Sequence, residues 1–318
     1  MQNKPKVSVV VVNYNTSDLL RQCLISVLKK TKDINYSTYV VDNGSTDDSV
    51  EMIKKEFSTV NLILNEYNAG FAKANNQALS LVQSEYVLLL NSDTIFKSDV
   101  ISELRNFMDK NNKVAIVGPR LTRENGTIQP STYPIPNLGT AIIKTLRLYL
   151  ILPRKTVGNI FLGSFWDHNK EKPVGRISGT CILVRKKAMD EVGLLDENFF
   201  FYGEVHDWCW RMWKSNWEVW FSPLGDVVHL RGQTAKKKWN TVERHIIVLK
   251  ETFRLFSKHL PPLKNWLIIF NYFISDIIGY FYKKLREKYS YTKEQELNIL
   301  RTEIFWYAKW LFCGGYIK

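Results

Sequence analysis

Cysteine, glycine and proline are all sparse in this chain of 318 residues. The four cysteines lie far apart and form no Cys-x-x-Cys pair, which excludes a disulfide scaffold and a zinc ribbon; they are Cys23, Cys181, Cys209 and Cys313. With 16 glycines and 10 prolines, collagen-like and low-complexity classes are excluded as well. A hydrophobic content of 45% instead predicts a globular protein with a substantial core.

The amino terminus lacks the features of a secretory signal. The apolar run after Lys6 spans only Val7 to Val12, which is too short for the hydrophobic region of a signal peptide, and no cleavage site follows it. We therefore expect a cytoplasmic protein.

Acidic residues are scarce in the tail of the chain. Residues 231–318 carry 17 Lys and Arg against 7 Asp and Glu, whereas the preceding 230 residues are almost balanced at 27 and 24. The net charge of +13 therefore belongs mainly to the tail. A basic tail of this kind binds either nucleic acid or an anionic membrane surface.

Aliphatic runs alternate with helical periodicity over the first hundred residues. We expect strands and helices, in turn, at Val7–Val12, Asp18–Lys30, Thr38–Asp42, Asp47–Phe57, Asn61–Asn65, Ala72–Val82 and Tyr86–Leu90. This series of βαβ units predicts the α/β class, with a parallel sheet and right-handed crossovers. Ligands of such sheets bind beyond the carboxyl ends of the strands, where Asn13, Asp42 and Asp93 occur. Asn and Asp are also common turn residues, but three in register favour a binding site.

The tail contains a long apolar segment, Leu263–Tyr282, in which the one acid is Asp276 and seven of the 20 residues are aromatic. A helical projection gives an apolar face of Trp266, Ile269, Phe270, Phe273, Ile274, Ile277, Tyr280 and Phe281. The opposite, polar face holds Asn265, Asn271, Ser275, Asp276 and Gly279. Because a central acid is costly in a spanning helix, we predict an amphipathic helix lying on a membrane surface. A membrane surface therefore fits the tail better as a binding partner than nucleic acid does. The alternative is a helical layer packed on the preceding domain or on a second copy of the chain, as in a homo-oligomer.

Several short motifs occur in order along most of the chain. They are Val11-Val-Asn-Tyr-Asn15, Val41-Asp-Asn-Gly-Ser-Thr-Asp47, Asn68-Ala-Gly-Phe71 with Asn75-Asn76, Leu90-Asn-Ser-Asp93, Ser178-Gly179, Phe199-Phe-Phe-Tyr-Gly-Glu204 with Asp207-Trp-Cys-Trp-Arg211, and Val228-His229. In this order and spacing they resemble the family 2 glycosyltransferases, and within them the bacterial rhamnosyltransferases of cell-surface polysaccharide synthesis. The resemblance implies a GT-A fold over residues 5–240, a Rossmann-like, mostly parallel sheet flanked by helices. Residues 241–318 then form the amphipathic helical tail.

The resemblance assigns a nucleotide-sugar site to the ends of the first strands. Asp42 would accept a hydrogen bond from the ring N–H of uracil or thymine, while Asn13 and groups near Asn43 meet the carbonyl edges. Gly70 permits a close backbone approach to the diphosphate or the sugar. Asn75 would point toward the ribose or the donor sugar, although Asn is also a routine residue early in a helix.

Asn91-Ser-Asp93 resembles the Asp-x-Asp element of the family, with Asn91 in the first acidic position. A divalent cation, Mg²⁺ or Mn²⁺, would be bound by Asp93 and by the diphosphate, whose charge it stabilises as the nucleotide leaves. The family places a histidine at the position of His229, as a further ligand or a hydrogen-bond donor to phosphate. A structural role is the alternative for this histidine.

The general base departs from the family pattern. The family has two adjacent acids after Tyr-Gly and the second is usually the base, but here Glu204 is followed by Val205. We expect Glu204 to take the proton of the acceptor hydroxyl, with Asp207 as the second candidate. Asp207 is equally suited to a structural role, in which it orients Arg211 or caps the helix.

The resemblance implies an inverting glycosyltransferase that uses a dTDP- or UDP-sugar donor, most simply dTDP-rhamnose. The acceptor would be a saccharide on a polyprenyl diphosphate, met by a peripheral enzyme at the inner face of the cell membrane. The alternative is a catalytically silent relative that binds nucleotide or glycan within an assembly, and Val205 is the residue that favours it.

Overall fold

The computed structural model describes residues 4–32, 34–230, 241–286 and 291–313, and the chain divides into two compact units. The first unit joins residues 1–134 to residues 162–237. The second joins residues 135–161 to residues 238–318, so an internal segment of the chain folds together with the basic tail.

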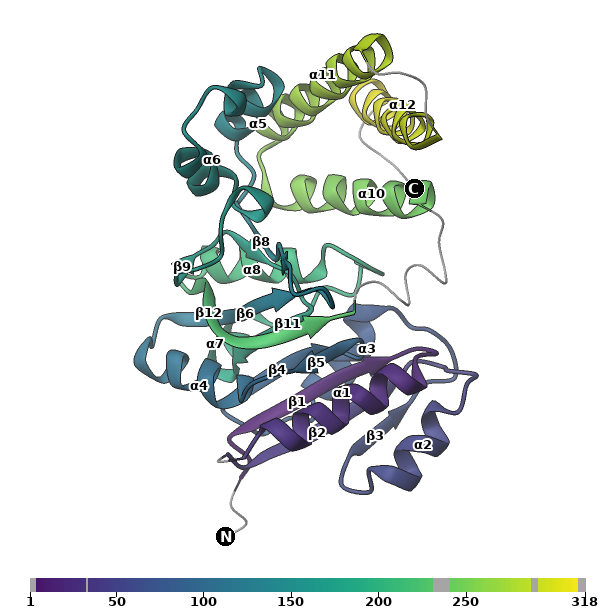
Figure 1. The fold of residues 1–318 in the computed structure, drawn as a ribbon, viewed down its shortest axis with the longest axis vertical. Coiled ribbons are helices and arrows are strands. Elements are labelled where there is room, and N and C mark those ends of the chain that lie inside the picture. Colours follow the sequence, from purple (N-terminus) through teal and green to yellow (C-terminus); the bar gives the residue numbers. More distant parts are fainter. Residues whose placement is uncertain (1–3, 33, 231–240, 287–290, 314–318) are drawn as a thin grey trace. The chain divides into compact units, whose positions relative to one another are not determined.

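The first unit is built on one mixed sheet with helices on both faces (Figure 1). Its elements are β1 (Val7–Asn13), α1 (Ser17–Lys30), β2 (Tyr36–Asp42), α2 (Ser49–Glu56), β3 (Asn61–Leu64), α3 (Phe71–Leu79), β4 (Tyr86–Asn91), β5 (Thr94–Phe96), α4 (Val100–Lys110), β6 (Val114–Thr122), β7 (Ile128–Gln129), β8 (Thr132–Tyr133), η2 (Gly163–Phe165), β9 (Lys172–Pro173), β10 (Arg176–Ile177), β11 (Cys181–Arg185), α7 (Lys186–Val192), α8 (Glu204–Lys214) and β12 (Glu218–His229).

The strand order across this sheet is β3-β2-β1-β4-β11-β6-β12-β5, with β7 paired to β6 and β9 to β12. The first four strands are parallel, as the βαβ series predicts. β11 runs antiparallel to β4 and β6, and β12 runs parallel to β6. The predicted α/β class, with a sheet flanked by helices, is confirmed.

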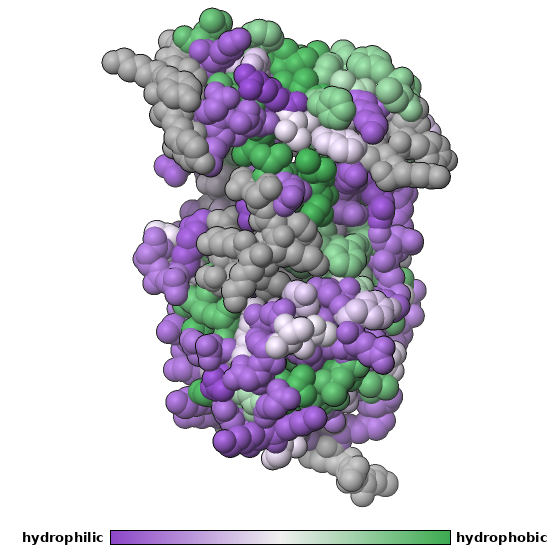
Figure 2. Space-filling view, turned by 90° about the vertical axis from the view of Figure 1, so that its right-hand side faces the viewer, coloured by the Kyte–Doolittle hydropathy of each residue, from purple (hydrophilic) through white to green (hydrophobic). Residues whose placement is uncertain are grey.

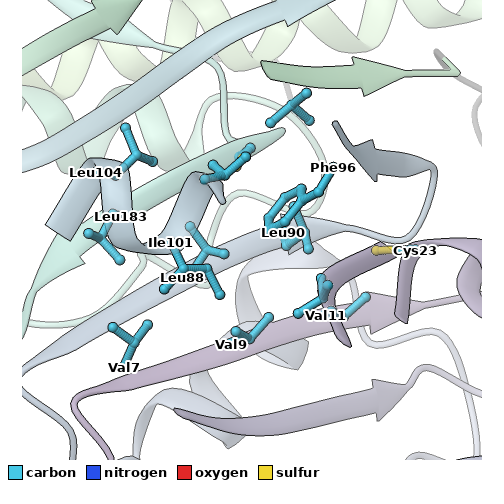
Figure 3. Close-up of a cluster of buried hydrophobic side chains, with 14 of the residues drawn as sticks. Val7, Val9, Val11, Cys23, Leu88, Leu90, Phe96, Ile101, Leu104 and Leu183 are labelled. Atoms are coloured by element: carbon cyan, nitrogen blue, oxygen red, sulfur yellow. The ribbon is translucent and has the colours of Figure 1, made fainter. Parts of the chain in front are cut away.

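Both faces of the sheet are buried, which explains the nearly unbroken valine run of β1. Val7, Val9 and Val11 face one side, where they meet Leu88 and the helices α1 and α4 (Figure 3). Val10 faces the other side, which α3, α7 and α8 cover. A strand covered on both faces is apolar on both, and this is the pattern of a central parallel strand; the exception, buried Ser8, hydrogen-bonds to Ser37 and Ser84.

The second unit is helical and consists of α5 (Leu138–Thr145), η1 (Leu148–Leu150), α6 (Arg154–Phe161), α10 (Thr241–His259), α11 (Pro262–Arg286) and α12 (Tyr291–Phe312). α11 packs against α5 and α12. The Thr145 hydroxyl on α5 donates to the backbone carbonyl of Asn271 on α11, at 2.8 Å. Within the described ranges, no helix combines the length and the apolarity needed to cross a membrane.

Candidate active site

The polar residues that end β1, β2 and β4 lie side by side, as expected from the parallel pairing. Asn13 is in register with Asp42, and its neighbour Val12 is in register with Asn91. A fourth strand end joins them, because β12 pairs with β5 and places His229 opposite Thr94. Residues from four strands, more than 200 positions apart at the extremes, therefore share one edge of the sheet.

Asp42 is buried in a small network with its neighbours. One carboxylate oxygen accepts from the Asn13 amide at 2.9 Å, and the other accepts from the backbone N–H of Ser45 at 2.9 Å. The Asn13 amide also donates to the Ser45 hydroxyl, and its oxygen accepts from Thr16. Each carboxylate oxygen has two lone pairs, so Asp42 retains room for another donor. Asn13 has used both amide hydrogens, and its role here is to orient Asp42.

Asn43 hydrogen-bonds to the loop that follows β3. Its oxygen accepts from the Asn65 amide and from the Ala69 backbone N–H, both at 3.0 Å, and its nitrogen donates to Asn68 at 3.0 Å. All of these partners belong to the same loop. The loop that ends at Gly70 is therefore fixed directly beside Asp42.

Gly70 has a φ of +88°, a conformation that favours glycine. A Cβ at this position would lie 2.8 Å from the backbone oxygen of Phe200, whose carbonyl also accepts from the Phe71 N–H at 3.0 Å. The close approach that Gly70 permits in this structure is thus to the segment that leads into α8. It connects the loop that follows β3 to the segment that carries the candidate base.

Asn75 is 1% exposed on α3, and its amide donates to the Phe71 carbonyl at 2.8 Å. The adjacent Asn76, to which the sequence assigned no role, makes longer-range contacts. It donates to the Leu195 carbonyl and to Glu197, both at 2.9 Å, and accepts from the Leu195 N–H at 3.1 Å. Asn76 therefore fastens α3 to the loop that precedes α8.

Asp93 and His229 are brought together at the sheet edge. The two side chains are each 7% exposed, and an Asp93 carboxylate oxygen lies 3.1 Å from His229 Nε2. The other ring nitrogen, Nδ1, lies 2.9 Å from the amide nitrogen of Gln129 and 3.2 Å from its oxygen. Sequence reasoning missed Gln129, since nothing marks a residue of a two-residue strand 100 positions away. Asn91 contributes backbone contacts, and its N–H donates to the Thr180 carbonyl at 2.9 Å.

The pair of Asp93 and His229 has the donor chemistry of a partial metal site. It offers one carboxylate and one imidazole, and no group of three or more His, Cys, Asp and Glu that could hold a metal occurs in the described part of the chain. Two protein donors suit a cation that completes its shell with phosphate oxygens and water. Since Mg²⁺ strongly prefers oxygen ligands, the imidazole fits Mn²⁺ more readily.

Glu204 opens α8 directly after Gly203, which has a φ of +92°, and it is 7% exposed. Asp207, one turn further on, is fully buried and accepts from the Arg211 guanidinium at 2.7 Å. Arg211 in turn donates to the backbone carbonyls of Val192 and Leu194. Asp207 thus orients Arg211, the second of the two roles that the sequence left open for it.

Val205 is 3% exposed and packs into the apolar core. Its Cγ2 lies so close to Gly179 that a Cβ there would approach it to 2.7 Å. The position of the second family acid therefore faces the Ser178-Gly179 turn, where this chain has a methyl group. Glu204 is the remaining acid of the motif that is not held by Arg211.

His206, the other unusual residue of the motif, contacts Arg176 and Tyr133. An Arg176 nitrogen lies 3.4 Å from His206 Nδ1, and the Tyr133 ring packs edge-on at 5.4 Å. Burial and the Arg176 charge lower the pKa of His206 well below its usual value. Because arginine can only donate, Nδ1 accepts and the proton resides on Nε2. Neutral His206 is therefore a hydrogen-bond donor beside the candidate base.

The sequence was compared with protein families and with curated proteins. The model of glycosyl transferase family 2 matches residues 8–193. An N-acetylglucosaminyl-diphospho-decaprenol L-rhamnosyltransferase of Mycobacterium tuberculosis is 26% identical over 245 residues, covering 70% of this chain and 75% of that protein. The low-salt glycan biosynthesis hexosyltransferase Agl10 of Haloferax volcanii is 25% identical, covering 70% of this chain and 66% of that one.

Solved structures show the same fold. A mannosyltransferase from Pyrobaculum calidifontis, in complex with GDP-Man and Mn²⁺, superposes with a TM-score of 0.61 at 13% identity, covering 98% of this chain and 89% of that one. GalNAc-T7 with UDP, GalNAc and Mn²⁺ gives a TM-score of 0.58 at 14% identity, covering 97% and 57%. These likenesses confirm the predicted GT-A fold.

Proposed function

Because the chain belongs to glycosyl transferase family 2 and is a glycosyltransferase, we propose its donor sugar and its acceptor. We propose an inverting transferase that takes rhamnose from dTDP-rhamnose and adds it to a saccharide on a polyprenyl diphosphate. The relative from Mycobacterium tuberculosis, named for rhamnosyl transfer to a decaprenol-linked acceptor, supports both halves of this proposal. The observation that carries it is the row of polar strand ends on one sheet edge.

In this proposal, Asp42 recognises the pyrimidine base. Its carboxylate is held in place by Asn13 and Ser45 and accepts the ring N–H of thymine or uracil through a remaining lone pair. The Asn43 network fixes the adjoining loop, so the slot is formed before the nucleotide binds. A preformed slot loses little conformational entropy on binding.

Asp93 and His229 would hold a divalent cation, Mn²⁺ or Mg²⁺, together with the donor diphosphate. When bound, such a cation neutralises the charge that develops on the departing nucleoside diphosphate. Gln129 contacts the far nitrogen of His229 and thereby fixes the orientation of the ring.

Glu204 is the proposed general base. It would accept the proton of the acceptor hydroxyl as the oxygen attacks the anomeric carbon from the side opposite the nucleotide, which inverts the configuration at that carbon. Gly70 and Phe200 connect the nucleotide-side loop to the start of α8, so donor and base are held by one interlocked framework.

A lipid-linked acceptor requires the enzyme to work at the membrane where that acceptor resides. We therefore place the protein peripherally, at the inner face of the cell membrane. The second candidate function is a silent relative that binds nucleotide without transfer, and the burial of Val205 at the position of the second acid is the observation that favours it.

The test measures release of nucleoside diphosphate from dTDP-, UDP- and GDP-sugars with a lipid-linked acceptor extract and Mn²⁺ or Mg²⁺. The proposal expects release from dTDP-rhamnose that is lost in Asp93→Ala. The matched control is Asp18→Ala, which removes a carboxylate that is 89% exposed on α1 and should leave release unchanged. Tight nucleotide binding with no release from any donor would establish the silent relative.

A further inference from the structure

Helix α11 directs its polar side toward the other helices of the second unit. Asn265 is 3% exposed, and its amide donates to Ser257 on α10 at 3.1 Å. Asp276 lies beside Glu303 of α12 and Lys144 of α5, and burial together with Glu303 raises the pKa of Asp276 to about 7. The face that the sequence predicts as polar is thus the packing face of the helix.

The apolar side of α11 is only partly covered, because Phe273 packs on Phe312 of α12 whereas Trp266 and Phe281 reach solvent. Of the eight residues on the predicted apolar face, Ile269 alone is buried among those described. Large apolar side chains of this helix that reach solvent, with their exposed fractions, are Leu263 (71%), Trp266 (36%), Ile278 (42%), Phe281 (56%), Tyr282 (44%) and Leu285 (82%). Figure 2 shows hydrophobic side chains exposed at its upper end, where the helices of this unit are drawn, with hydrophilic ones between them.

A second exposed segment adjoins the end of α11. In the connection from α5 to α6, Leu146 is 62% exposed, Leu150 67% and Ile151 80%. The guanidinium of Arg147, in the same connection, lies 4.6 Å from the ring centre of Tyr282. Segments far apart in the chain therefore form one surface, the docking surface, made of Leu146, Leu150, Ile151, Ile278, Phe281, Tyr282 and Leu285.

Basic residues predominate around the docking surface. Residues 135–161 contain four basic residues, Lys144, Arg147, Arg154 and Lys155, and no acidic one. α11 adds Lys284 near its end, next to Lys283, which pairs with Glu296 of α12, and the single acid of α11, Asp276, faces the other helices. Exposed aromatic and aliphatic side chains among cations are the features of a surface that lies in an anionic lipid interface. A second copy of the chain would instead bring two cationic surfaces together.

We propose that the docking surface seats the protein on a bilayer containing anionic lipid, with the apolar side chains in the interface and the cations at the headgroups. This inference rests on the proposed function in one respect, the purpose of membrane docking, which is to hold the enzyme where a lipid-linked acceptor resides. The geometry and the charge that carry it belong to the second unit alone.

The test is vesicle co-sedimentation of the full-length protein, with phosphatidylcholine vesicles that contain or lack phosphatidylglycerol. We expect binding only to the anionic vesicles and weaker binding at high salt. L150E/I151E and F281E/L285E should each weaken binding at least tenfold, and R154E/K155E should also weaken it. The matched control is L64E/L81E, which places the same charges on two leucines of the first unit that are 54% exposed.

Three results would overturn this proposal. The first is no binding to anionic vesicles, and the second is an equal loss of binding in L64E/L81E. The third is a change from dimer to monomer in L150E/I151E, measured by light scattering without lipid, which would assign the surface to a contact between copies. Release of nucleoside diphosphate is assayed in parallel to distinguish failure of the proposed function from failure of the docking surface. Vesicle binding without donor turnover refutes the proposed function and leaves the docking surface intact.

Discussion

The buried carboxyl of Asp276 makes the helical second unit sensitive to pH. It lies beside Glu303, with His245 of α10 3.3 Å from the Glu303 carboxylate, and Lys144 only partly offsets the negative charge. Burial and Glu303 raise the pKa of Asp276 from 3.8 to about 7, whereas in the unfolded chain the group keeps its ordinary value. Tyr307 is also close, and its neutral form carries no charge that would compensate Asp276.

The direction of the effect follows from proton linkage. Between about pH 4 and pH 7 the folded state binds a proton at Asp276 that the unfolded state has lost, so stability falls as the pH rises through this range. One pKa unit corresponds to about 1.4 kcal/mol. The free energy of unfolding should therefore fall by on the order of 2 kcal/mol between about pH 5.5 and pH 8. Asp276→Asn keeps the shape of the side chain and removes the titration.

The assay is hydrogen exchange of α11 and α12 in the wild type and in Asp276→Asn at the two pH values, corrected for intrinsic exchange rates. We expect the wild-type helices to lose protection at the higher pH and the variant to keep it. Glu66→Gln, which neutralises an exposed carboxylate of the first unit, is the control and should behave as wild type. Equal losses in wild type and Asp276→Asn would refute the assignment of this carboxyl.

Three further predictions concern the first unit. Gly70→Ala should lower the free energy of unfolding by about 1–3 kcal/mol in urea titrations, because φ is +88° and the new Cβ meets the Phe200 carbonyl; unchanged stability would contradict this packing. Asp207→Asn should lower the melting temperature and cost about 1–3 kcal/mol, because Arg211 loses the buried carboxylate that it pairs with; a loss of turnover at full stability would instead favour a chemical role. EDTA should abolish turnover and Mn²⁺ should restore it, whereas activity that persists in EDTA would exclude a cation at Asp93.

The first strands of the sheet could be predicted because local pattern and long-range structure agree there. The valines of β1 line both faces of the strand because helices cover both, the buried Ser8 hydrogen-bonds to Ser37 and Ser84, and Asn13 marks the end of the strand. Since parallel strands end at one edge, the proximity of Asn13 and Asp42 followed from their positions in the sequence alone. The pairing of Asp93 with His229 needed the family resemblance, because β12 reaches β5 across more than 130 residues.

Other features could not be predicted because they depend on partners far away in the chain. The periodicity of α11 divided its residues into two faces, but did not show that the face holding Asp276 packs inward against Lys144 and Glu303. The segment Leu138–Leu152 forms α5 and η1, and α5 packs on α11, which follows much later in the chain. Arg176 gave no signal either, because its contact with His206 appears only once β10 and α8 are folded together.

The assignment of Glu204 as the general base is tested by comparing variants of the enzyme. The turnover number and the donor dissociation constant are measured for wild type, Glu204→Gln and the control Asp18→Asn, which changes an exposed carboxylate, with the same donor and acceptor. We expect Glu204→Gln to lose turnover by about 10²–10⁴-fold, while donor affinity and stability stay unchanged. Turnover of Glu204→Gln within threefold of wild type would contradict this assignment and move the search for the base away from the start of α8.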